Sequence, residues 1–170
     1  MSTDDRIVVG VSGSANSAAA LRWAAAEARL RTAEIWAVHT WSSPMEMLAP
    51  YVSMRGVPSY DQQRQVSRAL LAAAISHAFG PGSDGCEAGV RSILVEGHPA
   101  AVLLRYAAGA RLLVLDRRLR PRHPGGVVLG VVARTCIAHA PCPTALIAAS
   151  EVADDVEASS SSQEHICVGR

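Results

Sequence analysis

Positive charge is concentrated between residues 116 and 126, where four arginines precede a pair of glycines. A guanidinium group can hold a phosphate with two hydrogen bonds at once. The glycines stand directly before a segment with helical character, and the free N–H groups at a helix start also attract anions. These residues would suit an anion or a nucleotide, and the alternative is a basic loop that is only solvated. They are Arg117, Arg118, Arg120, Arg122, Gly125 and Gly126.

The best-known phosphate-binding and hydrolytic motifs are absent from the sequence. A Walker P-loop needs a lysine that reaches the phosphates, and the chain contains no lysine. A dinucleotide site needs G-x-G-x-x-G and an acid after the second strand, whereas the first turn reads Gly10-Val-Ser-Gly13 and the second strand ends at Thr40-Trp41. No G-x-S-x-G nucleophile elbow occurs. A Ser-His-Asp arrangement stays open on spacing alone, but no catalytic residue is predicted.

Composition narrows the classes of partner. The net charge is +1, which argues against a protein that binds nucleic acid by neutralising phosphates. The apolar run 127–133 is too short to span a bilayer, and the polar N-terminal segment has no signal-peptide core, so we expect a cytoplasmic protein without a membrane partner. The four cysteines form no C-x-x-C pair. Reduced thiols without a metal site are therefore expected.

Five apolar stretches alternate with four helical patterns. Unbroken apolar runs indicate strands that are buried on both faces, as in a parallel sheet. The fold class predicted from this alternation is α/β, with a doubly wound, five-stranded parallel sheet. The expected strands are 7–11, 34–40, 86–95, 112–115 and 144–148. The expected helices are 17–31, one between Ser59 and Gly80, one between Gly97 and Gly109, and 127–139. The second helix would begin with a capping box between Ser59 and Gln62.

Ligands of such sheets bind at the carboxyl ends of the strands, near the switch point in strand order. The candidate loops are therefore 12–17, 40–58, 96–100 and 116–126. His39 would end up buried in the second strand and is interpreted as a core residue, while His98 begins a helix on the ligand side. Residues 1–149 are expected to form one domain, and the acidic, serine-rich residues 150–170 a disordered tail.

Several segments, in this order, resemble bacterial universal stress proteins, and the likeness covers about residues 5 to 148. The resemblance implies a Rossmann-like sheet with strand order 3-2-1-4-5, and a stress-response protein that is commonly a homodimer joined through its last strand. The segments are Ile7-Val-Val-Gly-Val-Ser-Gly-Ser14, Ala19-Ala-Leu-Arg-Trp-Ala24, Ala37-Val-His39, Glu96-Gly-His-Pro-Ala100, Leu112-Leu-Val-Leu115 and His139-Ala-Pro-Cys-Pro143.

One branch of that family binds ATP through the motif G-x2-G-x9-G-[ST], and this chain departs from it. Asp116 and Leu119 stand where the first two glycines are expected, Gly130 stands one residue late for the third, and Val131 replaces the hydroxyl residue. Bare glycine backbone lets N–H groups approach phosphates, whereas a carboxylate repels them. Members of that branch usually also carry an Asp where this chain has Ser12. Ordinary ATP binding is therefore expected to be impaired.

The resemblance also implies a candidate nucleotide site, in which Thr40 matches a position of the adenine pocket. The implied cofactor, if there is one, is ATP or another adenine nucleotide. The last strand is an apolar edge, which is prone to pairing, and it is the expected dimer interface. The candidate site is Gly10, Ser12, Thr40, Gly97, Asp116, Arg118, Leu119, Gly130 and Val131, and the interface residues are Thr144, Leu146 and Ile147.

The favoured function is a non-catalytic regulatory stress protein that acts by contact with an unidentified protein partner or through its dimer state. The rival is a nucleotide-binding stress sensor that uses the altered, arginine-rich loop. A weak hydrolase is the third hypothesis. Residues 12–17 also resemble, distantly, the S-G-G-x-D-S phosphate loop of ATP-pyrophosphatases, but the chain is too short for the catalytic apparatus of those enzymes.

Overall fold

The computed structural model describes residues 5–42, 59–80, 89–117, 119–122 and 126–148. None of the helices described there is long and apolar enough to cross a membrane. In chain order the elements are β1 (Arg6–Gly10), α1 (Ala15–Arg31), β2 (Glu34–Trp41), α3 (Tyr60–Phe79), β3 (Val90–Glu96), α4 (Pro99–Ala107), β4 (Leu112–Asp116), β5 (Leu119–Arg122), β6 (Gly126–Leu129), α5 (Val131–His139) and β7 (Thr144–Ile147).

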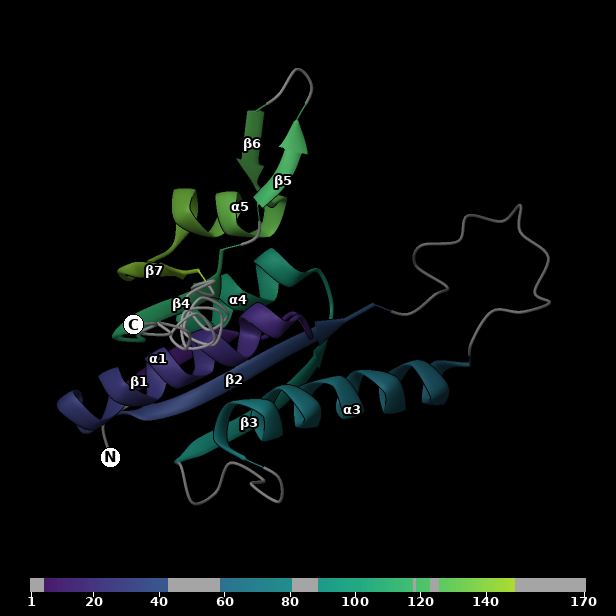
Figure 1. Cartoon of the computed structure of the whole chain (residues 1–170), viewed down its shortest axis with the longest axis horizontal. Coiled ribbons are helices and arrows are strands. Elements are labelled where there is room, and N and C mark those ends of the chain that lie inside the picture. The colour runs from purple at the N-terminus through teal and green to yellow at the C-terminus, as the bar shows by residue number, and fades with distance from the viewer. Residues whose placement is uncertain (1–4, 43–58, 81–88, 118, 123–125, 149–170) are drawn as a thin grey trace, which may run out of the picture.

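The main sheet has five parallel strands in the order β3-β2-β1-β4-β7 (Figure 1). This confirms the predicted doubly wound, Rossmann-like sheet, with β7 in the place of the expected fifth strand. The chain runs outward from β1 through β2 to β3 and then returns to β4 on the other side of β1. The direction of winding therefore reverses between β1 and β4, and this is where such sheets bind their ligands.

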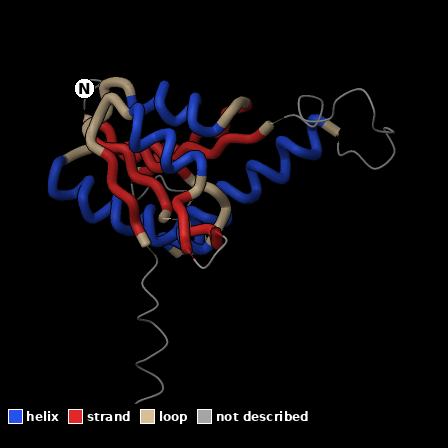
Figure 2. Tube along the Cα trace, turned by 90° about the horizontal axis from the view of Figure 1, so that it is seen from above, coloured by secondary structure: helices blue, strands red, loops and turns tan. Residues whose placement is uncertain are grey.

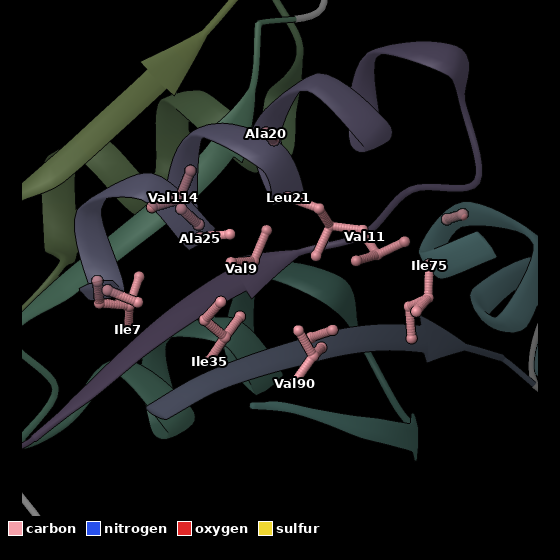
Figure 3. Close-up of a cluster of buried hydrophobic side chains, with 14 of the residues drawn as sticks. Ile7, Val9, Val11, Ala20, Leu21, Ala25, Ile35, Ile75, Val90 and Val114 are labelled. Carbon is pink, nitrogen blue, oxygen red and sulfur yellow. The ribbon is translucent and has the colours of Figure 1, made fainter. Parts of the chain in front are cut away.

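Helices cover both faces of the sheet (Figure 2). Successive strand residues point to opposite faces, so Ile7 and Val9 of β1 join a cluster with α1 and α3, while Val8 joins a cluster with α4 and α5. Figure 3 shows the first cluster, with side chains of the strands gathered against Leu21 of α1 and Ile75 of α3. The apolar composition of β1 and β4 follows from this burial on two sides.

The inward face of α3 differs from the one that its apolar spacing predicts. On α1 the spacing predicts a buried face around Leu21, and this face is buried. On α3 the spacing predicts that Val66 and Leu70 face inward, but they are 56% and 41% exposed, while Leu71 and Ile75 are buried. Both faces of α3 carry apolar residues of similar size, so the spacing alone does not choose between them. The predicted capping box is confirmed, since Ser59 Oγ accepts from Gln62 N at 3.2 Å and Gln62 Oε1 accepts from Ser59 N at 2.8 Å.

The predicted helix 127–139 is wrong in its first turn, and the predicted loop 116–126 contains a strand. Residues 126–129 form β6, which pairs antiparallel with β5 in a hairpin that stands apart from the main sheet, beside α5 (Figure 1). β-branched Val127 and Val128 favour a strand, and Gly130 separates them from α5. In the third expected strand, β3 begins at Val90, and residues 86–88 lie outside the described part of the chain.

Candidate functional site

A pocket of about 410 Å³ opens at the carboxyl ends of β1, β2 and β4, beside the first turns of α4 and α5. This is the switch point of the sheet, where the topology predicts a ligand. The volume falls in the range of small-molecule sites. The described residues that line it are Gly10, Val11, Ser12, Val38, His39, Thr40, Pro99, Leu103, Leu115, Asp116, Gly130, Val131, Val132 and Ala133.

Three serines organise the turn between β1 and α1. Ser17 is fully buried, and its Oγ accepts a hydrogen bond from the backbone N–H of Ser12 at 3.1 Å. The Oγ atoms of Ser12 and Ser17 are also hydrogen-bonded, at 3.0 Å. Gly13 has φ +77° and lets the chain reverse between Ser12 and Ser14. The turn therefore presents the Ser12 and Ser14 hydroxyls toward the end of β4.

Asp116, the last residue of β4, receives both of these hydroxyls. Its Oδ2 accepts from Ser12 Oγ at 2.6 Å and from Ser14 Oγ at 2.8 Å. The residue is only 9% exposed and lines the pocket. Hydrogen bonds to a carboxylate are about twice as strong as neutral ones, so the two serines hold the acid in place. The lining of the pocket thus contains a carboxylate that is held in a fixed position.

The apolar part of the pocket lining depends on Gly10. A Cβ atom at Gly10 would lie 2.7 Å from Leu115 Cδ2 and 3.2 Å from Leu103 Cδ1. Both leucines line the pocket together with Val38. Glycine is therefore required at this position because the two leucines pack directly on its backbone.

His39 and Thr40 form the β2 side of the pocket. The imidazole Nδ1 of His39 is 2.7 Å from the carbonyl oxygen of Val11, and the residue is 7% exposed. This confirms the interpretation of His39 as a satisfied core residue. Thr40 lies on the pocket wall, and its predicted role in an adenine pocket stays a prediction.

The first turn of α5 closes the pocket on the β4 side. Its N-cap, Gly130, provides no side-chain cap, so the N–H groups of this turn have no partner from a capping side chain. Val131 follows as the first helical residue and is 67% exposed. This turn could receive an anion, but it faces the same pocket as the Asp116 carboxylate.

The structure brings most of the predicted site together. Gly10, Ser12, Thr40, Asp116, Gly130 and Val131 all line the pocket, although they come from four separate segments. Gly97 is not among the described lining residues. It has φ +139°, and its N–H donates to the carbonyl of Trp41 at 2.9 Å. A glycine at position 97 is therefore explained by the positive φ of the backbone there.

Two further predicted residues belong to the hairpin region. Leu119 is the first residue of β5 and pairs with Leu129. Arg118 lies outside the described residues. The expected interface residues Thr144, Leu146 and Ile147 are on β7, which is an edge strand of the main sheet.

Several residues of the site were not predicted from the sequence. Ser14 and Ser17 carry a signal in the sequence, because serines at 12, 14 and 17 cluster around the start of a helix. Val38, Leu103 and Leu115 carry none, since each belongs to an ordinary apolar pattern and reaches the pocket only through the fold.

Comparison with known proteins gives a consistent result. The model of the universal stress protein family matches residues 5–148. A universal stress protein of Mycobacterium tuberculosis (strain H37Rv) is 32% identical over a match of 148 residues, and the match covers 83% of this chain and 47% of the relative. The chain thus spans about half the length of the curated relatives it matches.

Solved structures of low identity share the fold. A universal stress protein from Archaeoglobus fulgidus in complex with dAMP has a TM-score of 0.56 and 22% identity, covering 84% of this chain and 96% of that one. A universal stress protein in complex with cAMP has a TM-score of 0.56 and 18% identity, covering 86% and 98%.

Proposed function

The chain belongs to the universal stress protein family, and on that premise we propose that it is a non-catalytic regulatory member whose pocket binds ATP poorly. Its output would be contact with a protein partner or a change of dimer state. The observation that carries this proposal is the position of the Asp116 carboxylate, which lines the pocket and is held by Ser12 and Ser14.

Electrostatics makes a triphosphate a poor ligand beside this acid. Two like unit charges 4 Å apart repel by about 4 kcal/mol at the effective dielectric typical of sites near a protein surface. Among the described lining residues there is no lysine or arginine that could bind the phosphates. The departures at Leu119 and Val131 act in the same direction, because they replace a glycine and a hydroxyl of the family's ATP motif.

The proposed absence of catalysis is supported by how the ionisable groups of the pocket are used. Among the described lining residues these groups are Asp116 and His39, and both make hydrogen bonds within the protein. Asp116 is bonded directly to serine hydroxyls, and the Nδ1 of His39 is bonded to the Val11 carbonyl, so these contacts do not form the Ser-His-Asp order of a catalytic triad. Phosphate release from ATP should therefore not exceed that of a heat-inactivated sample, and release above that blank would contradict the proposal.

Dimerisation through β7 is part of the proposed output. β7 is at the edge of the sheet and pairs with β4 on its inner side. An apolar edge of this kind invites pairing with a second copy. Size-exclusion chromatography with light scattering should find a dimer, and a monomer at high concentration would refute this part.

The cytoplasmic location stays a prediction, which cell fractionation would test.

A nucleotide sensor is the second candidate, supported by the neighbours that hold dAMP and cAMP. The pocket retains an apolar wall and Thr40, which would suit an adenine ring. Arginines of the hairpin region would have to hold the phosphate. Arg118→Ala and Arg122→Ala should then abolish binding, and a thermal-shift screen of phosphate ligands without any shift would remove this candidate.

The direct test of the main proposal is isothermal titration with ATP, ADP and AMP. The proposal predicts weak or undetectable binding of ATP. A Kd in the micromolar range for ATP would overturn it.

A further inference from the structure

We propose that residues 151–157, the acidic segment, bind within the same molecule to a basic edge of the sheet formed by Arg117, Arg134 and the start of α5. In that position the acidic segment would compete with anions for these groups. The contact would exist whether or not the pocket binds ATP, so it goes beyond the proposed function.

The basic edge lies at the carboxyl ends of the strands. Arg117 directly follows β4, and Arg134 lies one turn into α5, whose first residues line the pocket beside the end of β4. Both arginine side chains are exposed, and neither takes part in an ion pair between described residues. The first turn of α5 adds partial positive charge, because its N-cap residue makes no side-chain cap. The edge therefore offers two cations and a helix start to an acidic partner.

The charge of the chain is divided between two stretches. Residues 116–134 contain five arginines and one acid, whereas residues 149–170 contain five acids and one arginine. Their net charges are therefore +4 and −4, although the whole chain carries only +1. Opposite charges of this size attract each other where screening by salt is incomplete. Four of the five acids in the second stretch belong to the acidic segment, and they are Glu151, Asp154, Asp155 and Glu157.

The acidic segment is tethered beside Arg117. The backbone N–H of Arg117 donates to the carbonyl oxygen of Ile147, the last residue of β7, at 2.7 Å. Glu151 follows Ile147 by four residues, and four fully extended residues reach at most about 14 Å. The first acid therefore stays near Arg117, and a tethered group binds at a high effective concentration. The exposed Arg64 and Arg68 are worse placed, because they belong to α3, which packs on β2 and β3 across β1 from β7.

A bound acidic segment would act against phosphate ligands. A guanidinium group holds a carboxylate through the same paired hydrogen bonds that it offers to a phosphate. Carboxylates on the basic edge would occupy these donors and bring further negative charge to the pocket, which the first turn of α5 lines. The contact is one between charges, so it requires no helix or strand in the acidic segment.

The test is a paramagnetic relaxation experiment on the full chain, with a nitroxide attached at Ser159→Cys, just after the acidic segment. Cys86, Cys142 and Cys167 are changed to alanine, and the same protein with Ser159 retained is the blank for any label at Cys136. The nitroxide should broaden the amide signals of Arg117 and Arg134.

Removing charge from either side should remove most of this broadening. Sodium chloride at about 1 M should do the same, because it shortens the Debye length to about 3 Å. Exchanging Glu and Asp at the four positions keeps the charge and should keep the broadening. On the receiving side, Arg117→Gln with Arg134→Gln should remove it, whereas Arg64→Gln with Arg68→Gln should not. The neutralised acidic segment carries Glu151→Gln, Asp154→Asn, Asp155→Asn and Glu157→Gln.

Three results would overturn the proposed contact. The first is an absence of broadening at Arg117 and Arg134 in the chain with its acids intact. The second is broadening that survives neutralisation of the four acids, which would show the tether alone. The third comes from mixing nitroxide-labelled protein with unlabelled, ¹⁵N-enriched protein. Broadening of the enriched protein in that mixture would place the acidic segment on a second molecule.

Discussion

Asp116 Oδ2 and Ser12 Oγ lie 2.6 Å apart and join the ends of β4 and β1 across 104 positions of the sequence. By the resemblance described in the sequence analysis, Ser12 matches a position that is usually Asp in the ATP-binding branch, and Asp116 matches a glycine of that branch's motif. On that prediction, the carboxylate of this chain stands on the neighbouring strand, in the segment expected to contact phosphate.

Exchanging the two positions should restore part of the nucleotide site. The variant Ser12→Asp with Asp116→Gly is expected to bind ATP at least tenfold more tightly than the natural chain, which corresponds to ~1.4 kcal/mol. Isothermal titration measures the change. As a control, Ser12→Asp alone places a second carboxylate beside Asp116 and should not improve binding. Equal ATP affinity in both variants would show that the exchange is not the cause.

Val131→Ser should add a hydroxyl at the start of α5 without a cost to the fold. The Val131 side chain is 67% exposed, and substitutions at such positions usually change stability by no more than about 0.5 kcal/mol. In the double variant Ser12→Asp with Asp116→Gly, the new hydroxyl should strengthen ATP binding further. It would add a hydrogen-bond donor to the first turn of α5, whose N-cap residue makes no side-chain cap. Urea unfolding measures the effect on stability, and ATP titration of the same samples measures the effect on binding. A free energy of unfolding lowered by several kcal/mol would contradict the exposure of Val131.

Ser59→Ala should lower the free energy of unfolding by about 1 kcal/mol, because it removes the N-cap of α3. The lost contact is the one between Ser59 Oγ and the backbone N–H of Gln62. Ser92→Ala, which alters an exposed serine of β3, is the matched control and should change stability little. Equal effects of both substitutions in urea unfolding would argue against the capping box.

Cys136 should stay unreactive in the folded chain. Burial raises the pKa of the Cys136 thiol, so the thiol remains protonated where an ordinary cysteine begins to form the reactive thiolate. In a variant with Cys86, Cys142 and Cys167 changed to alanine, Ellman's reagent at pH 8 should label Cys136 only at the rate of unfolding. Urea should accelerate the labelling.

The raised pKa of the Cys136 thiol also makes the free energy of unfolding depend on pH. Because the folded-state pKa is raised, the contribution of this thiol is fully present below the ordinary cysteine pKa, about 8.5, and is lost as the pH rises through the folded-state pKa. Fast labelling in native buffer at pH 8 would show that the thiol is neither buried nor protonated.

The sheet could be predicted because its central strands carry their own signal. The unbroken apolar runs around Val8 and Leu113 can be satisfied only between two layers, and both residues are fully buried. The inward face of α1 was predictable for a related reason, since Leu21 stands out among alanines. The inward face of α3 was not, because it depends on how Ile75 fits against the sheet. The β5–β6 hairpin escaped prediction because Val127 and Val128 suit a helix or a strand by pattern alone.

The site was predictable in its location but not in its geometry. The alternation of strands and helices places the turns after β1 and β4 at one edge of the sheet, and the resemblance adds the residue numbers. The bond from Ser14 Oγ to Asp116 Oδ2, 2.8 Å long, depends on the αL-type bend at Gly13 and on the register of β1 with β4. A pairing across 102 positions leaves no local trace in the sequence.

The most direct measurement is a pair of ATP titrations, on the natural chain and on Asp116→Asn, in the same buffer. Asparagine keeps the shape of the side chain and removes its charge, and its amide oxygen can still accept from Ser12 and Ser14. We predict weak binding to the natural chain and at least a tenfold gain for the variant. Tight ATP binding by the natural chain, with no gain on neutralising Asp116, would contradict the account.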